Sequence, residues 1–164
     1  MIDSPDIEAM VHHTPAHRKL ELRLWLRMLS CANLISADVR TKLRTNFRLT
    51  LPQFDLMAQL YREPTGLRLS DLSRRMMVSN GNLTGLVNRL QKDGILERET
   101  DATDRRAFVV RLSPQGIIEF AKVAKAHERW IVEMFACMEE SAMVRLTDDL
   151  GVVKRSIRNA NNSA

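Results

Sequence analysis

Residues 79–92 contain side chains suited to contacting the base edges of a duplex nucleic acid. Asparagine can form two hydrogen bonds with adenine, arginine can do so with guanine, and the threonine methyl can touch that of thymine. Gly81 and Gly85 each cost a helix up to about 1 kcal/mol relative to alanine, and close approach to a nucleic acid would explain that cost. A capped, solvated helix start is the alternative interpretation. The candidate contacts are Ser79, Asn80, Gly81, Asn82, Thr84, Gly85, Asn88 and Arg89.

A helix that lies in a major groove needs a second helix to brace it. The sequence predicts such a brace over 69–77, with Ser70 as its N-cap, followed by a tight turn. The second helix then covers 79–92, with Ser79 as its N-cap, and ends at Gly94. Arginines of the brace would contact phosphates, which position a protein without specifying sequence. These arginines are Arg74 and Arg75.

The pattern changes after Gly94. Residues 95–100 and 107–112 are strand candidates, and the polar loop 101–106 between them predicts a β-hairpin. Ser113 and the proline that follows it predict the N-cap and first residue of another helix.

The segment 104–113 resembles the wing signature of the MarR (multiple antibiotic resistance regulator) type of transcription factor. That signature is Asp, any residue and Arg, then five residues, then Leu and Thr. Segments 69–73 and 86–98 also follow the family's pattern, and the resemblance covers about residues 18–158. The sequence has Asp104-Arg105-Arg106-Ala107-Phe108-Val109-Val110-Arg111-Leu112-Ser113, with serine in the last position.

The resemblance implies a mainly α fold: a winged helix-turn-helix of three helices plus a β-hairpin wing, flanked by N- and C-terminal dimerisation helices. It implies a homodimeric, ligand-responsive regulator, a repressor, that binds a palindromic operator in double-stranded DNA. Arg106 would enter the minor groove with Asp104 orienting its guanidinium, in keeping with the attraction of narrow A·T-rich grooves for arginine. Arg105 would contact phosphate. A solvated turn charge is the alternative for Arg106.

Four segments are expected along the chain. Residues 1–17 lack sustained periodicity and are expected to form a flexible arm, and 49–116 to form the winged helix-turn-helix. Residues 18–48 predict a dimerisation helix, because its apolar positions cover so much of the circumference that a second subunit must bury some of them. Residues 117–160 predict two C-terminal dimerisation helices, the last with a seam for helix packing. That seam comprises Met143, Leu146, Leu150, Val153 and Ile157.

Members of this family usually bind a small molecule between the dimerisation helices and the winged module, so the resemblance implies an effector pocket here. Ordinary core packing is the alternative for each of its residues. The candidate lining residues are Trp25, Leu29, Phe54, Met57 and Ala58, with Phe120 or Trp130 as further candidates.

Excess positive charge falls in two stretches of a chain whose net charge is +5. Residues 66–116 carry nine basic and six acidic side chains, whereas 18–48 carry eight basic and two acidic ones. The basic residues that end the second stretch lie outside the expected DNA-contacting elements, so they form either a solvated or auxiliary phosphate-contacting face, or a docking patch for an anionic ligand. They are Arg40, Lys42, Arg44 and Arg48.

Residues 76–87 look like the subgroup of this family that controls the breakdown of aromatic (phenylpropanoid) acids. This similarity implies an aromatic acyl-CoA inducer, such as p-coumaroyl- or feruloyl-CoA, whose phosphates would meet the basic patch. A free aromatic acid or an oxidant is the alternative signal.

Composition narrows the class of protein. With 164 residues, 45% hydrophobic and 5% aromatic, the chain favours one mainly helical domain. It has no run of 18 apolar residues and no apolar leader segment, so we expect a cytoplasmic protein without a membrane partner. Cys31 and Cys137 lie in apolar surroundings and are predicted to be buried free thiols.

Metal, cofactor and enzymatic chemistry are not expected. The cysteines lack metal-ligand spacing, and the grouping of His12, His13 and His17 in the expected arm is interpreted as chance. No Gly-rich phosphate loop, HExxH or GxSxG motif is present. A helical protein-interaction module without DNA binding is the rival class.

Overall fold

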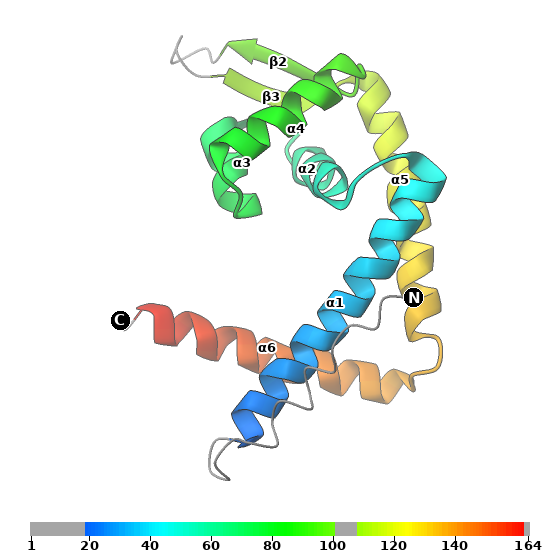
Figure 1. Cartoon of the computed structure of the whole chain (residues 1–164), viewed down its shortest axis with the longest axis vertical. Coiled ribbons are helices and arrows are strands. Elements are labelled where there is room, and N and C mark those ends of the chain that lie inside the picture. Colours follow the sequence, from blue (N-terminus) through cyan, green and yellow to red (C-terminus); the bar gives the residue numbers. More distant parts are fainter. Residues whose placement is uncertain (1–18, 101–107, 163–164) are drawn as a thin grey trace. The chain divides into compact units, whose positions relative to one another are not determined.

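The computed structural model describes residues 19–100 and 108–162. The chain divides into two compact units, 1–125 and 126–164, and the boundary falls within α5 (Figure 1). The mainly helical winged architecture predicted from the sequence is confirmed. Its elements are α1 (Lys19–Phe47), α2 (Leu51–Tyr61), β1 (Leu67–Arg68), α3 (Leu69–Met76), α4 (Asn80–Lys92), β2 (Leu96–Thr100), β3 (Phe108–Leu112), α5 (Pro114–Phe135) and α6 (Glu140–Asn162).

The junction between α1 and α2 is set by local chemistry. Arg48 adopts a left-handed conformation with φ 55°, which ends α1. Thr50 then caps α2: its hydroxyl accepts from the Gln53 N–H, and the Gln53 side chain accepts from the Thr50 N–H at 2.9 Å. This reciprocal pair is a capping box.

The predicted cap of α3 is wrong. The N-cap is Arg68, which makes no side-chain capping bond, and Ser70 lies inside the first turn. The reason is that Leu67 and Arg68 form β1 and pair with Val110 and Val109 of β3. The chain therefore passes directly from strand to helix. A strand of two residues is too short to produce an alternating pattern in the sequence.

The strands of the first unit form an antiparallel sheet in the order β1-β3-β2, and β2 pairs with β3 from Leu96 opposite Leu112 to Thr100 opposite Phe108. In Figure 1 the hairpin lies beside α4. The predicted hairpin is confirmed for its two arms, and its predicted tip, 101–106, lies outside the described residues. The core of the winged module includes side chains with at most 1% exposure: Leu56, Met57, Leu60, Leu72, Leu83, Val87, Leu90 and Val110.

The base of the hairpin is fastened to the start of α5. The Ser113 hydroxyl donates to the Gly94 carbonyl oxygen at 2.6 Å and accepts from the Gly116 N–H at 2.9 Å. A Cβ added to Gly116 would come within 2.1 Å of the Ile95 carbonyl oxygen, so only glycine allows this approach. Serine in place of the family's threonine thus keeps the capping hydroxyl.

The two cysteines, which were predicted to be buried, lie outside the winged module. Cys31 and Cys137 are exposed in the single chain, so the prediction of buried thiols is wrong. Around Cys31 the apolar side chains of α1 are themselves largely uncovered, and Cys137 lies in the turn after α5.

Within 19–100 and 108–162, the helices lack the apolar length that a bilayer crossing requires.

Candidate nucleic-acid interface

The turn between α3 and α4 is tight and held by its own side chains. Met77 adopts a left-handed conformation with φ 54° and is 93% exposed. The Ser73 hydroxyl donates to the Val78 carbonyl oxygen at 2.7 Å, which closes the turn. Ser79 then caps α4 by accepting from the Asn82 N–H, as predicted. These bonds fix the direction in which α4 leaves its brace.

Helix α4 buries one stripe and exposes the rest. Leu83, Val87 and Leu90 face the core, at the spacing of four and three that places side chains on one side of a helix. The exposed side includes all the polar residues predicted to contact bases and both predicted glycines. Its members are Asn80, Gly81, Asn82, Thr84, Gly85, Asn88 and Arg89.

The exposed surface of α4 is open around its glycines. Leaving out chain neighbours and the helix's own backbone, no atom of the described residues lies within 4 Å of a Cβ added to Gly81 or Gly85. The Thr84 hydroxyl donates to the Asn80 carbonyl oxygen at 2.8 Å, and the Thr84 side chain is exposed. Packing against the described residues therefore requires neither glycine, and their surface leaves room there for a close partner.

The predicted phosphate contacts of the brace already have acidic neighbours. Arg75 pairs with Glu63 at 2.9 Å, and Arg74 lies 3.4 Å from Asp71. All four side chains keep substantial exposure, so these pairs are solvent-screened and weak. Asp104, Arg105 and Arg106 of the predicted wing tip lie outside the described residues.

The outer arms of the hairpin carry charged residues that the sequence analysis did not single out. Arg111 of β3 donates to Glu97 at 2.9 Å and to Glu99 at 2.6 Å. The hydrogen bond to Glu97, with the charge of Glu99, raises the pKa of Arg111, so its guanidinium stays cationic. Arg98 lies over the Phe108 ring. Strand alternation combined with the register of the hairpin could have revealed both groups, but the register was not available from sequence.

Only two of the four basic residues predicted to bind an anionic ligand share an exposed face of one helix. Arg40 and Arg44 are exposed one helical turn apart on α1, so they share a face. Lys42 pairs with Asp38 at 2.8 Å. Arg48 lies beyond the end of α1 and lines a cavity of about 220 Å³, together with Met57 and Arg89 among others. Of the predicted patch, Arg40 and Arg44 are thus the best placed to act together.

The residues predicted to line an effector pocket differ in their burial, and one of the further candidates belongs to the second unit. Phe54 and Met57 of α2 are buried, Ala58 and Leu29 are half-buried, and Trp25 of α1 is 53% exposed. Phe54 stacks on Phe120 at 5.8 Å between ring centroids, and Phe120 contacts Tyr61 at 4.8 Å. Trp130, the other further candidate, belongs to the second unit.

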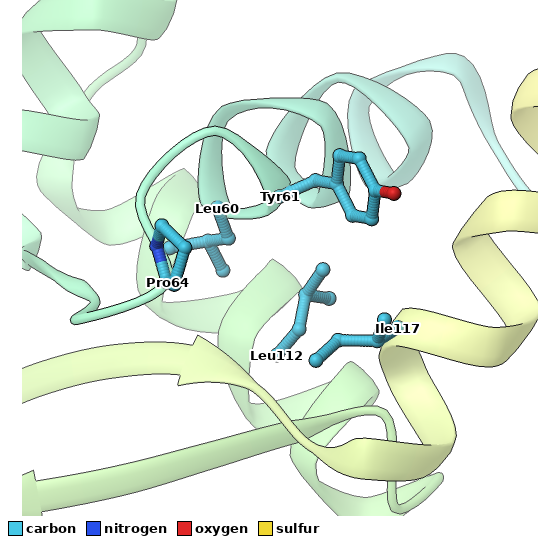
Figure 2. Close-up of a pocket in the computed structure, with 5 residues that line it drawn as sticks. All are labelled: Leu60, Tyr61, Pro64, Leu112 and Ile117. Atoms are coloured by element: carbon cyan, nitrogen blue, oxygen red, sulfur yellow. The ribbon is translucent and has the colours of Figure 1, made fainter.

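A cavity of about 330 Å³ lies next to this aromatic row. Figure 2 shows Tyr61, from the end of α2, across from Leu112 and Ile117, at the end of β3 and the start of α5. Leu60 and Pro64 complete the lining, so the Tyr61 hydroxyl is the polar side-chain group at this site. This cavity was not predicted from the sequence, because its lining comes from three elements whose apolar residues look like ordinary core residues.

Metal binding finds no support in the described part of the chain, where no group of three or more His, Cys, Asp or Glu side chains is placed to hold an ion. The cluster of His12, His13 and His17 lies outside the described residues.

Comparison with known proteins identifies the fold and the family. Residues 49–108 match the MarR family. The transcriptional activatory protein BadR of Rhodopseudomonas palustris is 37% identical over 106 residues, which are 62% of this chain and 59% of BadR. Streptococcus pneumoniae FabT, solved in complex with DNA, has a TM-score of 0.70 at 19% identity and shares the fold over 84% of this chain and 96% of its own.

A MarR family transcriptional regulator from Silicibacter pomeroyi matches this chain over most of the length of both proteins. Its crystal structure is 33% identical, has a TM-score of 0.75, and covers 88% of this chain and 99% of its own. The family and these relatives are transcriptional regulators and not enzymes. An identity of this level along nearly a whole solved structure, joined to the family match over the winged module, shows that the chain belongs to the MarR family of DNA-binding transcriptional regulators.

Proposed function

We propose that this protein is a homodimeric repressor that binds a palindromic operator and is released from it by a small molecule. Helix α4 lies in the major groove, and the wing segment 101–106 enters the minor groove. The observation that carries the proposal is the exposed side of α4, where a Cβ added to Gly81 or Gly85 would meet no atom of the described residues and where exposed asparagines could face bases.

The DNA contact is tested on duplexes selected by the protein from a random library. Asn82→Ala is expected to change base preference and to leave the salt dependence of binding unchanged, because a base contact releases no counterion. Gln91→Ala, at an exposed position in the last turn of α4, is the matched control. A changed salt slope with unchanged preference would make Asn82 a backbone contact. Sequence-independent binding by the wild type would remove the proposal.

The dimer is supported by uncovered apolar side chains. Leu20 and Leu34 of α1 are exposed in the single chain, as are Leu146, Leu150 and Ile157 of the predicted α6 seam. Leu150→Arg is expected to shift the sedimentation coefficient to that of a monomer and to abolish operator binding. Val152→Arg, an exposed apolar position outside that seam, is the control. A dimer that survives Leu150→Arg would exclude this seam.

For the effector, we propose an aromatic acyl-CoA thioester. The cavity beside Tyr61 offers an apolar wall for a ring, and Arg40 and Arg44 offer exposed charge for phosphates. Titration calorimetry with p-coumaroyl- and feruloyl-CoA tests this, and no binding below about 100 μM together with unaffected operator binding would exclude it. Ile117→Trp is expected to fill the cavity and block the response, whereas Arg44→Ala is expected to weaken binding of the thioester and not that of the free acid.

Repression is separated from activation by transcription in vitro from a promoter that carries the selected operator. The relative BadR is described as an activatory protein. Reduced transcript that recovers on addition of the effector supports repression, and a transcript increased by the protein would contradict it.

A further inference from the structure

The inner face of the hairpin changes character along its length. At its base, Leu96 of β2 and Val110 and Leu112 of β3 are buried in the core of the winged module. The next residues outward on the same face are Arg98 on β2 and Phe108 on β3, because side chains alternate along a strand. The aliphatic core is thus continued outward by an arginine and an aromatic ring.

Arg98 and Phe108 contact each other as diagonal neighbours across the two strands. Arg98 lies opposite Val110, and Phe108 lies opposite Thr100, two residues further out. The guanidinium carbon of Arg98 is 3.7 Å from the centroid of the Phe108 ring, which is a cation–π contact. The Arg98 Nε is buried and has no hydrogen-bond partner among the described residues. Among the described residues, the Phe108 ring and not a carboxylate contacts this guanidinium.

The opposite face of the hairpin is fixed by a different arginine. Arg111 lies opposite Glu97 and bonds both to it and to Glu99, one diagonal step outward. In the described arms of the hairpin, each face therefore has a cross-strand arginine contact. Arg111 contacts carboxylates, whereas Arg98 contacts an aromatic ring.

We propose that Arg98 is a positioning residue for the wing. By stacking on Phe108, the first residue of β3, it fixes the outer end of the described hairpin arms, and through that end it sets where Arg106, two positions earlier in the chain, meets DNA. This inference rests on the proposed placement of Arg106 in the minor groove. Ala107 alone separates Arg106 from Phe108 in the chain, so a displacement of Phe108 is expected to displace Arg106.

The rival role for Arg98 is a direct phosphate contact, and two substitutions separate the roles. Arg98→Lys keeps the charge but loses the planar group that stacks on the ring. Phe108→Leu keeps an apolar side chain and removes the ring, and Phe108→Tyr keeps the ring as the conservative control. A positioning role predicts that Arg98→Lys and Phe108→Leu behave alike, whereas a phosphate contact predicts that only loss of charge matters.

The experiment measures affinity, its salt dependence and base preference on duplexes selected by the wild-type protein from a random library. Arg98→Ala, Arg98→Lys and Phe108→Leu are each expected to weaken binding about threefold to fivefold. Each is also expected to relax the preference for A·T pairs in the flanks contacted by the wing, while preference at the central positions and the salt slope stay unchanged. The double variant Arg98→Ala/Phe108→Leu is expected to be no weaker than either single variant, and Phe108→Tyr to match the wild type.

Three results would overturn the inference: a salt slope reduced by about one in Arg98→Ala but not in Phe108→Leu, wild-type behaviour of Arg98→Lys, or additive effects in the double variant. Arg106→Ala separates this inference from the proposed function. If Arg106→Ala leaves flank preference intact, the minor-groove placement of the wing fails. If Arg106→Ala relaxes that preference and Phe108→Leu does not, the positioning role of Arg98 alone fails.

Discussion

Helix α4 and the hairpin of β2 and β3 both belong to the candidate DNA interface, yet they differ in the contacts that their exposed residues make within the described chain. On α4, two glycines meet nothing within the described chain, and the Thr84 hydroxyl bonds only to its own helix. On the hairpin, Arg111 is paired with two glutamates and Arg98 is held by an aromatic ring. The helix surface is left open for a partner, whereas the hairpin arms are fixed by contacts within the chain.

Replacing a glycine by alanine should affect stability differently in the two regions. The largest loss of stability is expected at the base of the hairpin. Gly116→Ala is expected to reduce the free energy of unfolding by about 3 kcal/mol, because its Cβ would collide with the backbone at Ile95, which cannot move aside cheaply. Urea denaturation followed by circular dichroism measures this loss. A variant as stable as the wild type would mean that the hairpin base is not rigid.

Ser113 offers the next largest effect at the same junction. Ser113→Ala is expected to cost about 2 kcal/mol, since it removes the cap of α5 and leaves the Gly94 carbonyl oxygen without this donor. Ser113→Thr retains the hydroxyl and is expected to stay within about 0.5 kcal/mol of the wild type. Equal losses in both variants would show that packing volume, and not the hydroxyl, matters at this position.

Gly85→Ala is expected to raise stability, in contrast to the two substitutions at the base of the hairpin. Alanine is favoured over glycine in a helix by up to about 1 kcal/mol and meets no neighbour here, so the melting temperature is expected to rise. Affinity for the selected operator is expected to fall, because a methyl group would stand where the DNA approaches. A stabilised variant that binds DNA as tightly as the wild type would break the comparison between an open helix and a fixed hairpin.

The smallest expected effect concerns Arg75, which lies on the brace. Its exposed pair with Glu63 contributes little, so Arg75→Gln is expected to change stability by at most about 0.5 kcal/mol. If Arg75 also contacts a phosphate, the same variant reduces the salt slope of DNA binding by about one. Glu63→Gln is the control, since it breaks the ion pair but leaves the cation, and its salt slope should not fall.

Local sequence signals predicted those features whose cause is local. The cap at Ser79, the end of α4 before Gly94 and the two arms of the hairpin were all confirmed, because capping bonds and strand alternation involve residues close in the chain. The predicted cap at Ser70 was wrong because residues 67 and 68 pair with β3, a strand that is distant in the sequence. Burial of Cys31 failed because an apolar pattern does not reveal which side of a helix is covered within one chain.

The sequence by itself determined the winged helix-turn-helix, the family and the exposed polar face of α4, since these follow from periodicity, capping and a contiguous motif. Only the tertiary structure decided that Arg98 meets Phe108, that Arg111 joins Glu97 to Glu99, and that Tyr61, Leu112 and Ile117 line one cavity. Such contacts depend on strand register and on the approach of separate elements. Both are set by the packing of the whole core and not by any one segment.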